Sequence, residues 1–208
     1  MEDSCSQNLF RNSSMLYFNS RSLANKSHKS KRDEYRKHQN FSILFLNALS
    51  IVNKRDILNA LLLQSSATIT FLVETWLKPF YPDSFIVDSS NYSITRSDRL
   101  NKKGGGVAAI FENSLASKIS TVDFDIKLCV GFEILAIDFF HNSSNYSRFI
   151  CVYLPPNNSK NIKIVQNLIH LLTQLHNYKH ETYILGDFNF SSMERTTFAF
   201  DHTRFFGV

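Results

Sequence analysis

The chain has 208 residues, of which 43% are hydrophobic and 20% charged, so it suits one folded α/β domain with a tail and is not a wholly disordered chain. It contains no run of roughly 20 apolar residues, and its N-terminus is polar, so the sequence predicts an intracellular protein without a membrane-spanning segment. The formal net charge of +5 favours an anionic partner, nucleic acid first.

Residues 1–40 show no sustained hydrophobic period, and we expect a mostly disordered tail in which only residues 15–18 favour a short strand. The tail is basic, which indicates either a phosphate-contacting arm or nuclear import signal, and hence a nuclear location, or a merely solvated linker. Seven basic residues fall within 17 positions, namely Arg21, Lys26, Lys29, Lys31, Arg32, Arg36 and Lys37.

The folded domain is predicted to span residues 41–208. Residues 42–46 are an apolar run typical of a buried strand, residues 54–63 carry the apolar stripe of a helix, and residues 69–73 predict a second strand. This order is a β-α-β opening.

The middle of the chain changes to short β-type runs separated by Gly, Asn, Ser and Asp clusters. The runs are residues 85–88, 92–95, 107–111, 134–139 and 148–154. An amphipathic helix at 161–178 and a strand at 182–185 follow. Strands and helices that alternate around a β-rich middle predict an α/β sandwich of two facing sheets.

Polar residues stand directly after several predicted strands, where α/β sheets often place active sites. Asn47 and Glu74 follow the first two strands, Tyr153 ends the run at 148–154, and Asp187 and Asn189 follow the last strand. A single residue of this kind is more often a helix cap or turn residue. Only the set together predicts a site.

Short motifs surround these residues in a definite order. They read LNALSIVNK at 46–54, VETWL at 73–77, RSDRLNKKGGGVAAIF at 96–111, FEILAI at 132–137, YLPP at 153–156 and GDFN at 186–189. Across residues 41–195 their order and wording resemble the endonuclease/exonuclease/phosphatase superfamily, in particular the endonuclease domain of LINE-type (non-LTR) retrotransposons. The resemblance implies a two-sheet α/β sandwich of the DNase I-like type.

The resemblance also implies Mg²⁺-dependent cleavage of a DNA phosphodiester, with Mn²⁺ as the substitute ion. Mg²⁺ takes hard oxygen ligands and keeps several waters. Glu74 would be the chief metal ligand with Asn47 beside it, Asp187 would deprotonate the attacking water, and Asn189 would bind the phosphate. Tyr153 would donate its hydroxyl to a phosphate oxygen; its alternative is a packed aromatic before the Pro-Pro turn.

A basic loop lies between two of the predicted strands. Arg96, Arg99, Lys102 and Lys103 precede three glycines, which suits a mobile loop touching the DNA backbone; the alternative is a solvated hairpin tip. Trp76 would either stack on a base or pack in the core.

The sequence departs from the family pattern in several places. Leu49 replaces the arginine of the first motif, and Arg195 replaces a tryptophan after GDFN. The closing Ser-Asp-His motif is not found, and the pair Asp201 and His202 follows GDFN too closely to replace it. We therefore expect an incomplete domain with little or no nuclease activity. Residues 16–26 echo the first motif, which indicates a partial duplication.

The sequence thus predicts a DNA-nicking module related to retrotransposon endonucleases, with DNA as its partner and no obligate protein partner evident. Two alternatives stay open. One is another activity of the superfamily, such as an abasic-site endonuclease or a phosphatase of lipid or inositol phosphates. The other is a remnant that binds nucleic acid without cleaving it.

Overall fold

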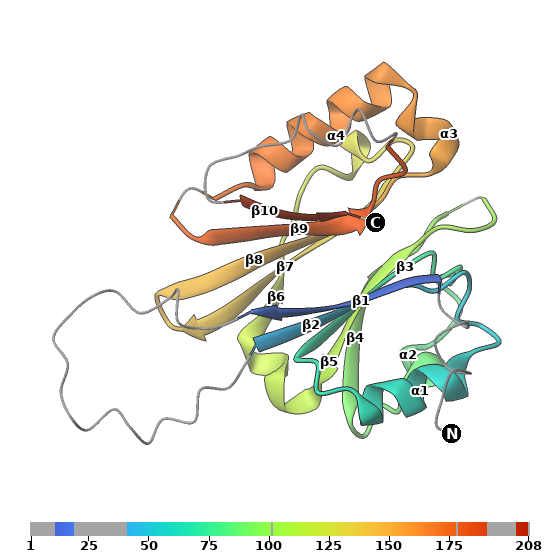
Figure 1. Cartoon of the computed structure of the whole chain (residues 1–208), viewed down its shortest axis with the longest axis vertical. Helices are drawn as coiled ribbons and strands as arrows, with labels where there is room; N and C mark the ends of the chain where they lie inside the picture. Colours follow the sequence, from blue (N-terminus) through green and yellow to red (C-terminus); the bar gives the residue numbers. More distant parts are fainter. Residues whose placement is uncertain (1–10, 19–40, 101, 178, 191–202, 208) are drawn as a thin grey trace, which may run out of the picture.

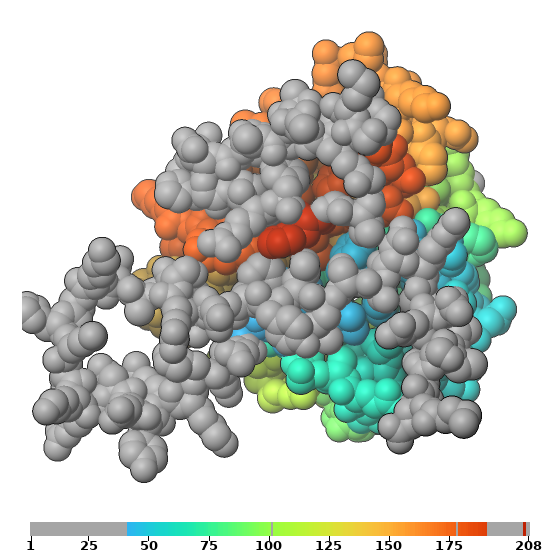
Figure 2. Space-filling view, viewed as in Figure 1, coloured from blue at the N-terminus to red at the C-terminus, as the bar shows by residue number. Residues whose placement is uncertain are grey.

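Two five-stranded sheets face each other in the computed structural model, which describes residues 11–18, 41–100, 102–177, 179–190 and 203–207. Helices lie on the outer side of each sheet (Figure 1). The two halves of the chain, blue to green and orange to red, occupy opposite sides of the molecule in Figure 2. This arrangement is the predicted two-sheet α/β sandwich.

The first sheet has the strand order β1-β2-β3-β5-β4. β2 and β3 run parallel, whereas β1, β5 and β4 pair antiparallel with their neighbours. The strands are β1 Arg11–Phe18, β2 Phe41–Asn47, β3 Ile69–Val73, β4 Tyr92–Ser97 and β5 Val107–Glu112. Helix α1, Arg55–Gln64, connects β2 to β3 and completes the predicted β-α-β opening.

The second sheet has the order β10-β9-β8-β7-β6. β8 runs parallel to β9, which runs parallel to β10, and β7 pairs antiparallel with β8 and β6. The strands are β6 Ile119–Thr121, β7 Glu133–Asn142, β8 Asn145–Tyr153, β9 Glu181–Asp187 and β10 Thr203–Gly207. The helices around them are η3 Asn113–Lys118, η4 Ile126–Leu128, α3 Pro156–Ser159 and α4 Ile162–Leu175.

Alternation of side chains along the strands builds three apolar layers. In β2, Ile43 and Phe45 face the second sheet, while Leu44 and Leu46 face α1. In β8 the same rule sends alternate residues to the central layer and to the layer under α4. Both faces of the inner strands are therefore buried, which explains why these strands read as continuous apolar runs.

Helix α4 is held at its start by its own sequence. The Asn161 side chain accepts hydrogen bonds from the backbone N–H groups of Lys163 and Ile164, which otherwise lack partners at a helix N-terminus. Its apolar stripe then packs on the second sheet through Leu168, Leu171, Leu172 and Leu175. No helix in the described part of the chain is long and apolar enough to cross a membrane.

The strand predicted at residues 85–88 is wrong, because the structure places helix α2, Asp83–Ile86, there. Pro82 holds the extended backbone before the helix, and Ile86 and Val87 are buried against the first sheet. The carbonyls of the turn are satisfied from α1, since Asn59 donates to the Ile86 carbonyl and Arg55 to that of Phe85. A four-residue apolar run does not distinguish a strand from one buried helical turn.

The segment predicted to be a mostly disordered tail contains a strand, β1, which includes the short strand predicted at residues 15–18 and begins earlier, at Arg11. β1 pairs with β2 over the positions from Arg11 opposite Asn47 to Phe18 opposite Phe41. The backbone hydrogen bonds that pair β1 with β2 require no particular residue type and leave no period in the sequence. The basic residues of the tail, most of the echoed motif, Arg195, Asp201 and His202 lie outside the described residues.

Candidate active site

The carboxyl ends of four strands from both sheets meet at one end of the sandwich. β2 and β3 lie side by side in the first sheet, and β8 and β9 in the second. Tyr153 and Asp187 stand opposite each other in the register of β8 and β9. The predicted site residues of the two sheets are thus placed at the same edge, as Figure 1 shows for the strands that carry them.

Asn47 joins the two sheets at this edge. Its amide nitrogen Nδ2 lies 2.9 Å from Glu74 Oε1 and 3.0 Å from Asp187 Oδ2, so one NH₂ group donates to both carboxylates. Asn47 and Asp187 are buried, and Glu74 is half-buried. Residues 140 positions apart therefore form one polar cluster.

The backbone around Asn47 and Glu74 is turned sharply. Leu49, Ser50, Glu74 and Trp76 all have positive φ, of 43°, 76°, 54° and 57°. Such conformations cost energy in residues with a side chain, and they cluster where the fold must aim a group at a site. Here they direct Glu74 to the edge that Asn47 occupies.

Two contacts stabilise the turn after β2. Asn47 Oδ1 accepts from the Leu49 backbone N–H at 3.2 Å, and Lys54 Nζ donates to the Ala48 carbonyl at 2.7 Å. Lys54 is the last residue of the first motif, and we gave it no role from the sequence. Leu49, at the position where the motif that this segment resembles has an arginine, lies at the surface.

A glycine of the GDFN motif shapes the end of β9. A Cβ atom on Gly186 would lie 2.2 Å from the Val152 carbonyl oxygen, so only glycine allows β8 and β9 to approach here. Asp187 is thereby brought beside Tyr153. Asn189, at φ 50°, donates its amide N–H to the Leu154 carbonyl at 3.0 Å. Its predicted role as a phosphate ligand stays a prediction.

Tyr153 is buried between the carboxylates and an arginine. Burial raises the pKa of its hydroxyl most, Glu74 and Asp187 raise it further by their charge, and Arg99 opposes them. The phenol is thus neutral at physiological pH and remains a hydrogen-bond donor, which is the state that its predicted role requires.

Arg99 crosses from the first sheet to the second. Its Nε and Nη2 atoms donate to the two carboxylate oxygens of Glu133 at 2.6 and 2.7 Å, and its guanidinium carbon lies 5.6 Å from the centre of the Tyr153 ring. A Cβ on Gly105 would lie 2.4 Å from this guanidinium, so that glycine makes room for it. Glu133 was missed by sequence reasoning, although a charge at the start of a buried strand was the signal.

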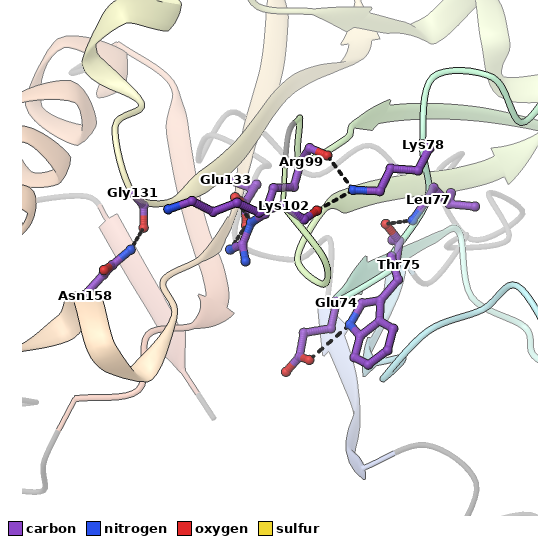
Figure 3. A network of polar contacts seen from close by, with 10 residues as sticks. Glu74, Thr75, Leu77, Lys78, Arg99, Lys102, Gly131, Glu133 and Asn158 are labelled. Atoms are coloured by element: carbon purple, nitrogen blue, oxygen red, sulfur yellow. Dashed lines mark hydrogen bonds and ion pairs between the residues drawn. The ribbon is translucent and has the colours of Figure 1, made fainter.

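The loop between β4 and β5 is tied to the segment after β3 (Figure 3). Lys78 Nζ donates to the carbonyls of Arg99 and Lys102, and the Trp76 backbone N–H donates to the Gly105 carbonyl at 2.9 Å. The Trp76 ring lies 5.5 Å from Lys103 Nζ, and its Nε1 donates to Glu74 at 3.4 Å. Trp76 is therefore half-buried between the loop and the site, which is neither core nor free surface.

The four residues predicted to bind DNA differ in their surroundings. Lys102 and Lys103 are exposed. Arg96 forms ion pairs with Asp83 and Asp98, each at 3.2 Å, and Arg99 is paired with Glu133. The two lysines are free to reach a phosphate, whereas the arginines already neutralise carboxylates of the protein. Contact of all four with DNA stays a prediction.

The donor set at the edge fits a magnesium ion. In the described part of the chain, no group of three or more His, Cys, Asp or Glu side chains is placed to hold a metal ion. Mg²⁺ needs fewer, because one or two carboxylates with waters and a substrate phosphate satisfy it. Glu74 and Asp187 supply two carboxylates, while Asn47 turns its nitrogen toward them and would have to flip its amide to become a ligand.

The chain matches no protein-family model and no curated protein by sequence. By structure it is similar to an AP endonuclease from Archaeoglobus fulgidus, with a TM-score of 0.54 and 18% identity, and to a 3′-5′ exonuclease from Neisseria meningitidis, with a TM-score of 0.50 and 17% identity. Each likeness covers 72% of this chain, but only 57% and 58% of those proteins. The chain thus spans less than two thirds of their length.

At these identities the likeness defines the fold. The protein has a DNase I-like α/β sandwich of two facing sheets, as these two nucleases do. The site at the meeting edge of its two sheets combines two carboxylates, a neutral phenol and nearby cations.

Proposed function

We propose that this chain is a Mg²⁺-dependent phosphodiesterase that acts on DNA and nicks it in the manner of a retrotransposon endonuclease. One observation carries the proposal: the Asn47 amide brings Glu74 and Asp187 together from opposite sheets. Two carboxylates held by one amide group repel each other, and a bound cation would relieve that repulsion. A divalent cation and a phosphate are the groups that such a cluster, with lysines beside it, would receive.

Each side chain of the site would have a distinct role. Glu74 would hold the metal ion, which when bound would neutralise the phosphate and the departing oxygen. Asp187 would orient the attacking water and accept its proton. Tyr153, kept neutral by burial, would donate its hydroxyl to a non-bridging phosphate oxygen. Lys102 and Lys103 would contact the DNA backbone outside the site.

The retrotransposon assignment depends on the motifs, since VETWL and YLPP favour that branch over abasic-site endonucleases and lipid or inositol phosphatases. A nuclear location and DNA as partner are part of the same proposal. A panel of plasmid DNA, abasic oligonucleotide and inositol phosphates separates the branches. Cleavage of the inositol phosphates alone would contradict the DNA assignment.

The decisive experiment measures nicking of supercoiled plasmid with and without Mg²⁺ for the wild type and for Glu74→Gln and Asp187→Asn. We expect at most weak Mg²⁺-dependent nicking by the wild type, in line with the little or no nuclease activity expected from its departures from the family pattern. Each substitution should lower this rate further, by about 10²-fold or more, because each removes a charge on which the chemistry depends. Glu112→Gln, an exposed glutamate at the end of β5, is the control and should leave the rate unchanged. Nicking that survives both site substitutions would refute the proposal.

The second candidate is binding of nucleic acid without cleavage, which the exposed Lys102 and Lys103 favour. Measuring DNA affinity against salt separates it from catalysis, because phosphate-driven binding falls steeply with salt whether or not a bond is cleaved. Salt-dependent binding with no Mg²⁺-dependent nicking would establish this second candidate.

A further inference from the structure

A pocket of about 650 Å³ opens beside the candidate active site. One wall is the end of β4 with the following loop, and the other is formed by η4, the start of β7 and α3. This volume is within the range of small-molecule sites, roughly 300–1,000 Å³. Of the residues given a role in the proposed function, only Lys102 lines it.

The pocket and the active site share a wall. Arg99 and Glu133 line the pocket, and the same Arg99 lies over the Tyr153 ring on the other side. In Figure 3 the Arg99, Glu133 and Lys102 side chains lie between Glu74 on one side and Gly131 and Asn158 on the other. When the phosphate of a bound molecule lies at Glu74 and Asp187, the group attached to that phosphate therefore lies next to the pocket.

The pocket lining is partly apolar and unusually exposed. Leu100 is 61% exposed and Ile126 is 74% exposed, and both line the pocket together with the half-buried Phe124. Apolar side chains gathered at the mouth of a pocket indicate a surface that is covered when a partner binds. A flat ring that packs on them is the simplest occupant.

The rest of the lining is polar. Asn157 is exposed on the rim, and Asn158 donates to the Gly131 carbonyl at 2.6 Å, which fixes the wall. Lys102 adds a cation to the lining. Apolar side chains at the mouth, amide groups and a cation match a nucleotide, which offers a flat face, a polar edge and a phosphate.

We propose that this pocket binds the nucleobase of the nucleotide that adjoins the cleaved phosphodiester, with the ring packed against Leu100, Phe124 and Ile126. The inference rests on the proposed function, since it takes the phosphate to lie at Glu74 and Asp187. It assigns the pocket a specificity role that is separate from bond cleavage.

The test measures binding of a short single-stranded DNA that carries the fluorescent base 2-aminopurine. Ile126→Glu and Leu100→Glu should each weaken binding about tenfold, since base stacking contributes roughly 1–3 kcal/mol per base. Leu63→Glu, at a site on α1 that is 71% exposed and outside the pocket, should bind as the wild type does. Unchanged affinity in both pocket variants would overturn the proposal, as would failure of the wild type to bind.

Hydrolysis of bis(p-nitrophenyl) phosphate, which has no base, separates this inference from the proposed function. The two pocket variants should cleave it at the wild-type rate while losing DNA affinity. If the wild type binds the oligonucleotide through the pocket but cleaves neither substrate, the proposed base-binding role is supported and the proposed hydrolytic function is contradicted. A loss of hydrolysis in the pocket variants equal to the loss of affinity would show that they damage the site as a whole, and would overturn the separate role.

Discussion

At the scale of single residues, Asn47 links the two carboxylates of the site. It is buried and donates one NH₂ group to two carboxylates that would otherwise repel each other. The same side chain accepts a hydrogen bond from Leu49, which shapes the turn after β2. Its amide therefore serves both the stability of the edge and the geometry of Glu74 and Asp187.

Asn47→Asp should convert this edge into a cluster of three carboxylates. In EDTA we expect the melting temperature to fall by about 5 °C, because hydrogen bonds to charged groups are worth roughly 1.5–3 kcal/mol and like charges replace them. Mg²⁺ or Mn²⁺ should restore more of the melting temperature in the variant than in the wild type. Asn59→Asp, an amide on α1 bonded to backbone carbonyls, is the control and should show no such gain.

His141 gives a prediction on pH. Burial lowers its pKa from the ordinary 6.5, Glu181 partly opposes this, and Lys118 adds to it. As the pH falls from 7 to 5, the unfolded chain binds a proton that the folded protein resists, so stability declines. His141→Gln should make the melting temperature less sensitive to pH across this range, and His170→Gln, an exposed histidine on α4, should not. An equal pH slope in both variants would contradict the assignment.

At the scale of elements, the β4–β5 loop is held by the segment that follows β3. The Lys78 side chain holds the loop, because its ammonium group donates hydrogen bonds to two loop carbonyls. Backbone bonds from Thr75 and Trp76 to Gly106 and Gly105 complete the contact. The loop with Lys102 and Lys103 is thus linked through Trp76 to Glu74.

Lys78→Met should loosen this loop while sparing the sheets. Methionine keeps the apolar stem but donates no hydrogen bond, so amide hydrogen exchange should rise in residues 99–106 and change little in β2 or β9. DNA affinity should fall about three- to tenfold, in line with the loss of one or two charge-assisted hydrogen bonds. Lys163→Met, an exposed lysine on α4, is the control. Exchange that rises throughout the protein would point to general destabilisation instead.

At the scale of the whole molecule, the two sheets are joined at the site by the Arg99–Glu133 pair, whose side chains are only 16% and 10% exposed. Glu133→Gln should lower the free energy of unfolding by about 3 kcal/mol, because it leaves a largely buried guanidinium without its countercharge. The double variant Arg99→Met/Glu133→Leu should lose less than the sum of the single variants in urea denaturation. Additive losses would show that the pair makes no direct contribution.

The sequence by itself predicted the sandwich and placed four polar candidate residues at strand ends. Apolar runs followed by a polar residue placed Asn47, Glu74, Tyr153 and Asp187 at strand ends, since a buried strand must be apolar on both faces and a polar group is tolerated only where it ends. The helices at α1 and α4 followed from their apolar periods.

Only the tertiary structure decided what these residues contact. Three contacts join segments between 21 and 140 residues apart, and no local pattern encodes them. They are the hydrogen bond from Asn47 to Asp187, the Arg99–Glu133 ion pair and the hydrogen bond from Lys78 to the Arg99 carbonyl. The helical turn at α2 was decided in the same way, by burial against α1, and so was the extension of β1 beyond the predicted residues 15–18, by backbone pairing with β2. Periodicity records which face of an element is buried, whereas the partner of a polar side chain is set by how the elements pack.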